Sequence, residues 1–251
     1  MDLSNAALQA ILDRIPTAAS AALLDELDRV LNESLARPGN DAAVLVDAVY
    51  QALRQADHFP ACTGRVSCLL SVAAHYYRAA RPEAGIAPAR EAVGLARSLG
   101  DPNWLRKSLT YLGILLADTR DIPHAIECYA EAIELARSMG DPAQECVLWV
   151  NLGLANYYAA HYGEAVACYE KALEFEGDTE LIQRCRQAAL SNIALCALHL
   201  NDVGRGLTAI QRVLAEGESP QSVDQLLSRV LREHHYARLL LQAGLTDQAR
   251  E

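Results

Sequence analysis

Histidines and a carboxylate gather in one part of this 251-residue chain, at Glu233-His234-His235, with His199 as a further candidate. Such side chains could bind a metal ion or act as a general acid and base. Adjacent histidines on a helix point about 100° apart, so His234 and His235 cannot both bind one ion without help. No nucleotide-binding, zinc-protease, serine-hydrolase or calcium-loop motif accompanies them. We therefore expect a structural or groove-lining role for these histidines, with no metal, no cofactor and no catalysis.

Seven cysteines could form disulfides or bind metal, but their number is odd and no two are spaced C-x-x-C. Cys128 and Cys168 stand forty residues apart in corresponding contexts, where a small buried thiol packs well. We expect reduced, structural cysteines and hence a cytoplasmic location, with a redox or metal role as the alternative.

Acidic residues outnumber basic ones by 32 to 22, which gives a formal net charge of -10. Affinity for nucleic acid depends on clustered Lys and Arg, and no basic run occurs. No apolar stretch approaches the roughly 18 residues of a membrane span, and the N-terminus lacks the basic start of a signal peptide. We expect a soluble protein that binds neither nucleic acid nor membrane. Its acidic surface serves solubility or, alternatively, favours a basic partner.

A forty-residue repeat organises the middle of the chain. The segment REAVGLARSLGDP at 90–102 returns as AEAIELARSMGDP at 130–142. Such self-similarity indicates copied units that stack because no single copy buries its own apolar face. Each connection offers a glycine for a left-handed helix end, an Asp to cap the next helix and a Pro for its first turn. These residues are Gly100-Asp101-Pro102 and Gly140-Asp141-Pro142.

An apolar residue followed by a small one marks the first helix of each repeat. Another small residue stands thirteen positions after that apolar residue. Small residues suit the point where two antiparallel helices approach closely. Tyr129 and Tyr169, further along the second helices, are expected to fill the gap between consecutive units. The markers are Val72-Ala73, Leu112-Gly113, Leu152-Gly153, Ile193-Ala194 and Tyr236-Ala237, and the small residues are Gly85, Ala125, Ala165, Gly206 and Ala249.

The central units resemble a known family. Trp149-x-x-Leu152-Gly153, followed by Ala165-x-x-x-Tyr169-x-x-Ala172, resembles the tetratricopeptide repeat pattern. The forty-residue spacing resembles the longer-helix variant of bacterial regulators. The resemblance implies an all-α fold, a right-handed α-α superhelical solenoid of helical hairpins whose first helices line a concave groove. We expect residues 1–60 to form an N-terminal helical cap or degenerate repeat, and residues 61–251 to form about five repeats, the last incomplete.

The residue before each marker pair should face the groove. In peptide-binding members of the family an Asn in this slot hydrogen-bonds the ligand backbone, so the resemblance implies this role for Asn151 and Asn192. One turn further along the same helices, tyrosine, aliphatic and a few polar residues suit a groove for a peptide or helix, unless they pack inside the superhelix. The predicted partner-binding residues are Tyr77, Tyr111, Asn151, Leu154, Tyr157, Tyr158, Asn192, His199, His235 and Arg238.

These features predict a non-enzymatic scaffold or sensor module that binds a protein or peptide. One alternative is the N-terminal regulatory domain of a larger bacterial signalling protein, such as a diguanylate cyclase, a histidine kinase or a transcription regulator. Another is an enzyme with its site inside the superhelix. Because the second helix of the last unit is only begun at Ala249-Arg250-Glu251, we expect either a continuing polypeptide or a homodimer formed through the unfinished repeat.

Overall fold

The computed structural model describes residues 3–15, 20–35, 43–55, 60–177, 179–216 and 238–239. Every regular element in these ranges is an α-helix, as predicted. The helices of the described ranges are α1 (Leu3–Leu12), α2 (Ala21–Leu35), α3 (Ala43–Gln55), α4 (Thr63–Arg78), α5 (Pro82–Leu99), α6 (Pro102–Asp118), α7 (Ile122–Ser138), α8 (Pro142–Tyr158), α9 (Tyr162–Leu173), α10 (Glu180–Leu200) and α11 (Val203–Glu216). None of these helices is both long and apolar enough to cross a membrane.

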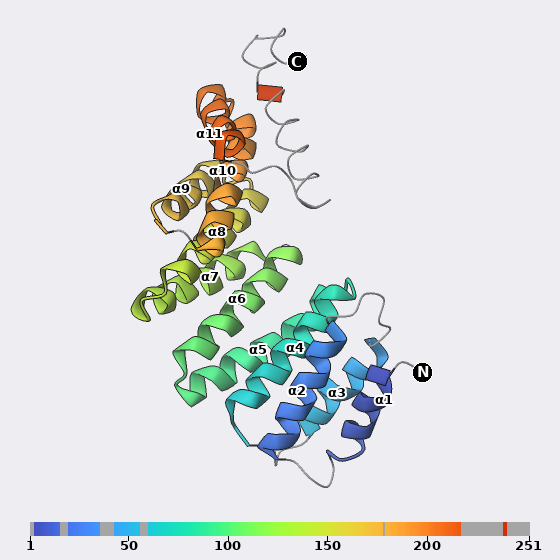
Figure 1. Ribbon diagram of the computed structural model, residues 1–251. Coiled ribbons are helices and arrows are strands. Elements are labelled where there is room, and N and C mark those ends of the chain that lie inside the picture. Colours follow the sequence, from blue (N-terminus) through green and yellow to red (C-terminus); the bar gives the residue numbers. More distant parts are fainter. Residues whose placement is uncertain are drawn as a thin grey trace. The chain divides into compact units, whose positions relative to one another are not determined.

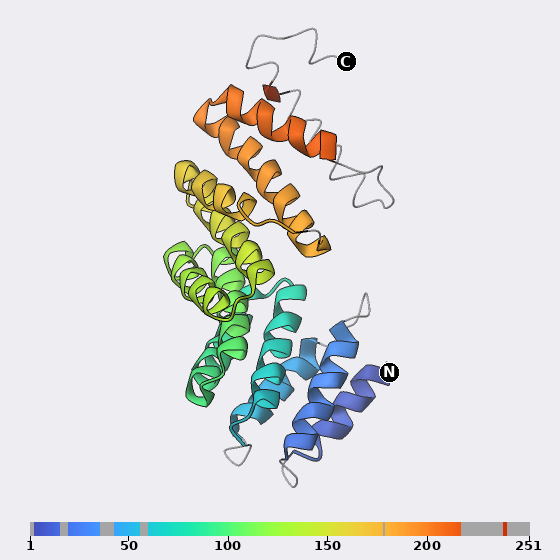
Figure 2. The ribbon, with the colours of Figure 1, turned by 60° about the vertical axis from the view of Figure 1, so that its left-hand side comes forward.

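The chain divides into two compact units, which we call unit 1 (Met1–Met139) and unit 2 (Gly140–Glu251). In unit 1, α4 pairs with α5 and α6 pairs with α7. In unit 2, α8 pairs with α9 and α10 pairs with α11, and each pair lies side by side in both ribbon views (Figures 1 and 2). The predicted boundary at residue 60, between cap and repeats, falls within unit 1 and stays a prediction.

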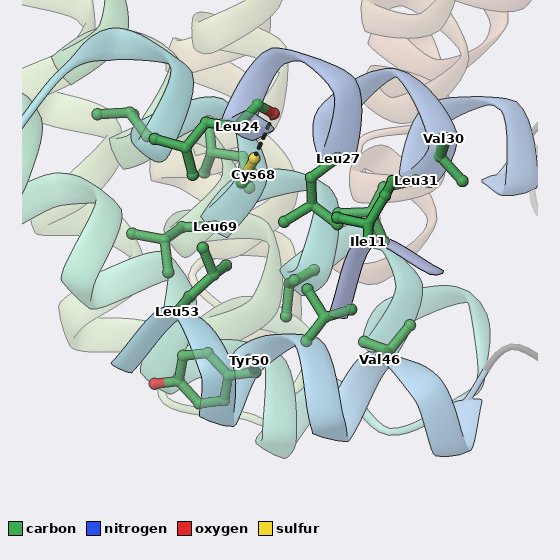
Figure 3. Packing of buried hydrophobic residues seen from close by; sticks show 14 of the residues in the cluster. Ile11, Leu24, Leu27, Val30, Leu31, Val46, Tyr50, Leu53, Cys68 and Leu69 are labelled. Atoms are coloured by element: carbon green, nitrogen blue, oxygen red, sulfur yellow. Dashed lines mark hydrogen bonds between the residues drawn. The ribbon is translucent and has the colours of Figure 1, made fainter. Parts of the chain in front are cut away.

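An apolar core joins the first helices of unit 1. Side chains from α1, α2, α3 and α4 meet in it, among them Ile11, Leu27 and Leu53, which are at most 2% exposed (Figure 3). The Cys68 thiol of α4 donates a hydrogen bond to the Leu24 carbonyl oxygen at 3.1 Å. This buried contact ties α4, the first helix of the first long hairpin, to α2.

Small residues allow the helices of a hairpin to approach closely, as predicted. A Cβ added at Gly85 would lie 3.1 Å from the Ala73 carbonyl oxygen, so α5 approaches α4 closely at this position. Ala125 and Ala165, in the corresponding slots of α7 and α9, are both fully buried. Ala249 lies outside the described residues.

Tyr129 and Tyr169 lie against the glycines of the marker pairs. A Cβ at Gly113 would lie 2.7 Å from Tyr129 Cε1, and one at Gly153 would lie 2.5 Å from Tyr169 Cε1. Each ring therefore packs on the glycine of its own hairpin, and Tyr169 also belongs to an apolar cluster with Cys185 and Ala189 of the next hairpin. The glycine of each marker pair makes room for a tyrosine, because a ring can sit against a helix backbone that carries no side chain.

The connections between hairpins have the predicted form. Gly100 and Gly140 are left-handed, with φ of 66° and 65°. The Asp101 carboxylate accepts hydrogen bonds from the backbone N–H groups of Asn103 and Trp104, both at 3.0 Å. Each helix therefore ends and the next begins within three residues, because the turn supplies partners for groups that a helix end leaves unpaired.

The turns inside the hairpins also use left-handed residues, which the sequence did not indicate. Alanine and arginine adopt this conformation at a cost, so they do not signal it. These residues are Ala80 (φ 55°), Arg120 (φ 67°), Ala160 (φ 61°) and Asn201 (φ 54°). Between residues 80 and 160 a left-handed residue thus ends a helix at every twentieth position.

Candidate protein-binding site

Two neighbouring helices of unit 2, α8 and α10, carry most of the predicted binding residues, and α10 packs on both α8 and α9. The Asp141 side chain caps α8 by accepting from the Gln144 N–H at 3.1 Å. The Thr179 hydroxyl caps α10 by accepting from the Ile182 N–H at 3.4 Å. These caps, with the buried residues along each helix, hold the two helices as rigid supports for their exposed faces.

Four aromatic side chains from α8, α9 and α10 form one cluster, which we call the tyrosine patch: Tyr157, Tyr158, Tyr162 and His199. The His199 ring stacks on Tyr162, with centroids 4.3 Å apart and an interplanar angle of 6°. Tyr157 meets Tyr158, Tyr162 and His199 edge-on at 6.1, 5.6 and 5.7 Å. Its hydroxyl forms a 3.3 Å hydrogen bond with His199 Nε2. These mutual contacts fix the orientation of the four rings.

The tyrosine patch is open to solvent. Tyr158 is 42% exposed, His199 is exposed, and Tyr157 and Tyr162 are half-buried. Burial, together with the neighbouring Tyr162, raises the pKa of Tyr157, while the positive charge of Arg238 opposes this shift. The Tyr157 hydroxyl therefore keeps its proton at neutral pH, and the patch presents apolar ring surface together with polar tips.

Two asparagine amides lie on the same helices as the patch. Asn151 and Asn192 are both half-buried, and neither amide has a hydrogen-bond partner among the described residues. Asn156, by contrast, donates to the Leu152 carbonyl oxygen at 2.9 Å and is 7% exposed. Within the described ranges the amides of Asn151 and Asn192 are thus unpaired, whereas Asn156 bonds to its own helix.

Sequence spacing places these amides on the faces that carry the patch. Asn151 precedes Tyr158 by seven residues on α8, and Asn192 precedes His199 by seven residues on α10. Residues seven apart share one helix face and are separated by about 10.5 Å along the axis. Leu154, three residues after Asn151, is half-buried on the same helix. Each helix therefore presents an amide and, two turns later, an aromatic ring.

The other predicted site residues are distributed differently. Tyr77 on α4 is 40% exposed, and Tyr111 on α6 is half-buried, with a pKa that burial and the nearby Tyr77 raise. Both belong to unit 1 and stay a separate prediction. Arg238 is exposed, and its charge reaches Tyr157. His235 lies outside the described residues.

Tyr162 is not among the predicted binding residues, because those were placed on the first helices of the hairpins. Tyr162 begins α9, a second helix, directly after a left-handed turn whose His161 N–H bonds to the Asn156 carbonyl oxygen at 2.9 Å. That turn reverses the chain tightly enough to bring Tyr162 back to Tyr157. The sequence signal for this contact is that Tyr162 stands only five residues after Tyr157.

Other candidate chemistry involves the histidines and cysteines. Within the described ranges, no group of three or more His, Cys, Asp or Glu side chains is placed to hold a metal ion. Glu233 and His234 lie outside these ranges. All seven cysteines are free thiols. A hydrogen bond with Cys185, and burial, raise the pKa of the Cys146 thiol, which is fully buried. Cys146 therefore stays protonated at neutral pH.

Comparison with known proteins identifies the fold. Residues 147–179 match the model of the tetratricopeptide repeat. Among curated proteins, none matches the sequence. The tetratricopeptide resemblance is nevertheless confirmed, because solved structures with this architecture match nearly the whole chain. Helices α4 to α7 in unit 1 and α8 to α11 in unit 2 form tetratricopeptide-like helical hairpins, while the right-handed superhelix stays a prediction.

Three solved structures illustrate the similarity. BtubC (BKLC) from P. vanneervenii is 19% identical with a TM-score of 0.65, over 88% of this chain and 87% of that one. A signal transduction ATPase with a tetratricopeptide repeat sensor from Pyrococcus horikoshii is 14% identical with a TM-score of 0.71, over 96% of this chain and 37% of that one. The apo quorum sensor NprR from B. thuringiensis is 12% identical with a TM-score of 0.63, over 96% of this chain and 73% of that one. At these identities the likeness shows the fold alone.

Proposed function

We propose that this chain is a non-enzymatic scaffold or sensor module that binds an extended protein or peptide segment on α8 and α10 of unit 2. The observation that carries the proposal is the pairing, on each helix, of an amide that has no hydrogen-bond partner among the described residues with an exposed aromatic ring seven residues later. An amide offers a donor and an acceptor to a peptide backbone whatever its side chains. Tyrosine supplies apolar contact area at low entropic cost and is frequent among interface hot spots.

Relatives of the same fold support a peptide as the ligand. The solved structure of NprR in complex with its cognate peptide NprX matches 99% of this chain and 76% of that one, at 11% identity and a TM-score of 0.55. This match concerns NprR, and for our chain it supports only that such a fold is compatible with peptide binding. The predicted concave groove is part of the proposal.

The test uses peptides selected on the wild-type chain from a random dodecapeptide phage library, with affinity measured by fluorescence anisotropy. Losing two hydrogen bonds to the peptide backbone should weaken binding about tenfold in Asn151→Ala/Asn192→Ala. Truncating a hot-spot ring in Tyr158→Ala should weaken it about thirtyfold. A peptide methylated at its backbone nitrogens should lose affinity for the wild type more than for the double variant.

Gln183→Ala provides the matched control, because Gln183 is an exposed residue of α10 outside the candidate site. It should bind like the wild type, and circular dichroism should show the same helicity and melting temperature for all variants. Equal peptide affinities of the wild type and the double variant would contradict the amide role. If Tyr158→Ala also kept full affinity, the proposed location of the binding site on α8 and α10 would be wrong.

A second candidate function is the regulatory part of a larger bacterial signalling protein, such as a diguanylate cyclase, a histidine kinase or a transcription regulator. The supporting observation is the match to the Pyrococcus horikoshii protein, whose tetratricopeptide repeats are described as its sensor and of which this chain covers 37%. Sequencing the gene beyond the codon for Glu251 tests this candidate. An output domain in the same reading frame would support it, and a stop codon there would contradict it.

The expected cellular location, partner class and oligomeric state belong to the same proposal. A cytoplasmic location agrees with seven free thiols, five of them buried. A partner other than nucleic acid agrees with the net charge of -10. Homodimerisation through the last repeat stays a prediction that sedimentation of the purified chain would test.

A further inference from the structure

Two cysteine side chains of unit 2 meet where α8, α9 and α10 pack together. Cys146 on α8 and Cys185 on α10 belong to one apolar cluster, in which Cys146 is fully buried and Cys185 is 7% exposed. The Cys146 thiol donates to the Ala172 carbonyl oxygen at 3.3 Å, and it is also in hydrogen-bonding contact with the Cys185 sulfur. We call Cys146 and Cys185 the thiol pair.

The C-terminal end of α9 brings the two cysteines to one place. The Cys146 thiol bonds to the carbonyl oxygen of Ala172. Arg186, the residue after Cys185, donates to the neighbouring Leu173 carbonyl oxygen at 2.8 Å. Both bonds satisfy carbonyl groups that the end of a helix leaves without partners. The contact within the thiol pair is therefore fixed by hydrogen bonds that tie α8 and α10 to the same turn of α9.

The two thiols differ in acidity and in burial. The hydrogen bond from Cys146 lowers the pKa of the Cys185 thiol, although burial opposes this shift. The same hydrogen bond, together with burial, raises the pKa of Cys146. Cys185 is thus the more readily ionised member and also the less buried one. Oxidants react with a thiolate, and a second thiol beside the oxidised sulfur can then close a disulfide.

Other thiols of unit 2 lack this arrangement. Cys168 on α9 and Cys196 on α10 are buried, and burial raises the pKa of each to about 11. Neither forms a hydrogen bond with another cysteine in the part of the chain that the structure describes. Both therefore stay protonated at neutral pH, which makes them internal references for the reactivity of Cys185.

We propose that Cys185 and Cys146 form a disulfide when the chain meets a peroxide, which joins α8 and α10 covalently. The Cys185 thiolate attacks one peroxide oxygen, the O–O bond breaks, and a sulfenic acid forms while the departing hydroxide takes up a proton. The Cys146 sulfur then attacks the Cys185 sulfur, the S–O bond breaks, and the oxygen leaves as water with the Cys146 proton. The two thiols lose two electrons, which reduce one peroxide to two waters.

This inference is independent of the proposed peptide binding, although it concerns the same two helices. In a reducing compartment a disulfide of this kind is transient and reports oxidation, rather than serving as a permanent link. The site is thus a modification site whose co-substrate is a peroxide.

The experiment treats the reduced full chain with hydrogen peroxide, alkylates the remaining thiols and maps the cysteines by tandem mass spectrometry. The mass before alkylation should fall by two hydrogen atoms. The denatured chain should then show two fewer free thiols than the seven of the reduced chain, and the linked peptides should contain Cys146 and Cys185. Dithiothreitol should restore both thiols. This measurement needs no variant, so it holds even where a substitution impairs folding.

Two variants separate the roles of the pair. In Cys146→Ala, Cys185 should stop at the sulfenic acid, and dimedone should trap it at least about tenfold faster than at Cys168. In Cys185→Ala, Cys146 should stay a thiol. Cys196→Ala is the matched control, because Cys196 is another buried cysteine of α10, and it should form the disulfide like the wild type.

Three results would each overturn the proposal. The first is a wild-type chain in which all seven thiols survive prolonged exposure to peroxide. The second is a disulfide between other cysteines in place of the link between Cys146 and Cys185. The third is equal dimedone labelling of Cys185 and Cys168 in a folded Cys146→Ala variant, with folding checked by circular dichroism.

Discussion

At the scale of single residues, the pairing of a glycine with a tyrosine determines how tightly each central hairpin closes. In Gly113→Ala the new Cβ would lie 2.7 Å from the ring of Tyr129, which is 2% exposed and has little room to move. We expect the clash to exceed the gain in helix propensity and to lower the free energy of unfolding by about 1–2 kcal/mol. Chemical denaturation of both proteins measures the difference.

Gly94→Ala is the control for this substitution. Gly94 lies inside α5 of the same unit, and a Cβ there would meet no atom within 4 Å. Replacing it should raise the free energy of unfolding by about 0.5–1 kcal/mol, because alanine loses less backbone entropy in a helix. A Gly113→Ala variant as stable as Gly94→Ala would show that the tyrosine ring can yield.

At the scale of helices, one capping geometry serves both kinds of connection. At the end of α4, the Ala80 and Arg81 N–H groups bond to the carbonyl oxygens of Tyr77 and Tyr76 at 3.0 and 2.9 Å. Gly100 at the end of α5 is left-handed as well, with φ of 66°. The difference is chemical, since glycine adopts this conformation without the steric cost that alanine bears.

Exchanging the two residue types should therefore have opposite effects. Ala80→Gly should stabilise unit 1 by about 0.5–1 kcal/mol, and Gly100→Ala should destabilise it by about 1 kcal/mol, although no atom obstructs a Cβ there. Thermal unfolding measures both. Ala79→Gly is the control, because Ala79 has φ of -77° and gains nothing from glycine. Equal signs for Ala80→Gly and Ala79→Gly would contradict the argument.

At the scale of the whole molecule, buried thiol and phenol groups with raised pKa values should lower the free energy of unfolding at alkaline pH. Burial raises the thiol pKa of Cys168 and Cys196 to about 11, from an ordinary value of 9.0, and burial also raises the pKa of Tyr169. The unfolded chain loses these protons first, so stability is complete below pH 9 and falls above it. A hydrogen bond with Cys146 lowers the pKa of the Cys185 thiol, so the ionisation of Cys185 favours the folded state as the pH rises. Melting temperatures in reductant should decrease from pH 8 to pH 11.

Tyr169→Phe isolates one contribution to this dependence. The Tyr169 hydroxyl is buried without a hydrogen-bond partner in the described structure, so its removal should change stability near pH 7 by less than about 1 kcal/mol. Between pH 10 and 11 the wild type should lose about 1 kcal/mol more than the variant, because unfolded tyrosine ionises there. Tyr158→Phe changes an exposed ring and serves as the control. Parallel pH curves for the wild type and Tyr169→Phe would refute this assignment.

Local sequence was sufficient wherever one residue's own conformational preference decides the structure. Gly100, Asp101 and Pro102 predicted the connection between α5 and α6, because the left-handed turn, the cap and the first helical turn are properties of those residues. The periodic small residues likewise predicted close helix contacts. The left-handed Ala80 escaped prediction because neighbouring helices, rather than alanine itself, impose that conformation.

The sequence by itself determined the all-α class and the hairpin unit, since repetition and helical periodicity are local and additive. Only the tertiary structure decided which rings meet. Tyr162 reaches Tyr157 through a turn, and His199 reaches both from a helix some forty residues later. Such contacts depend on the path of the backbone between distant segments, which no local pattern encodes.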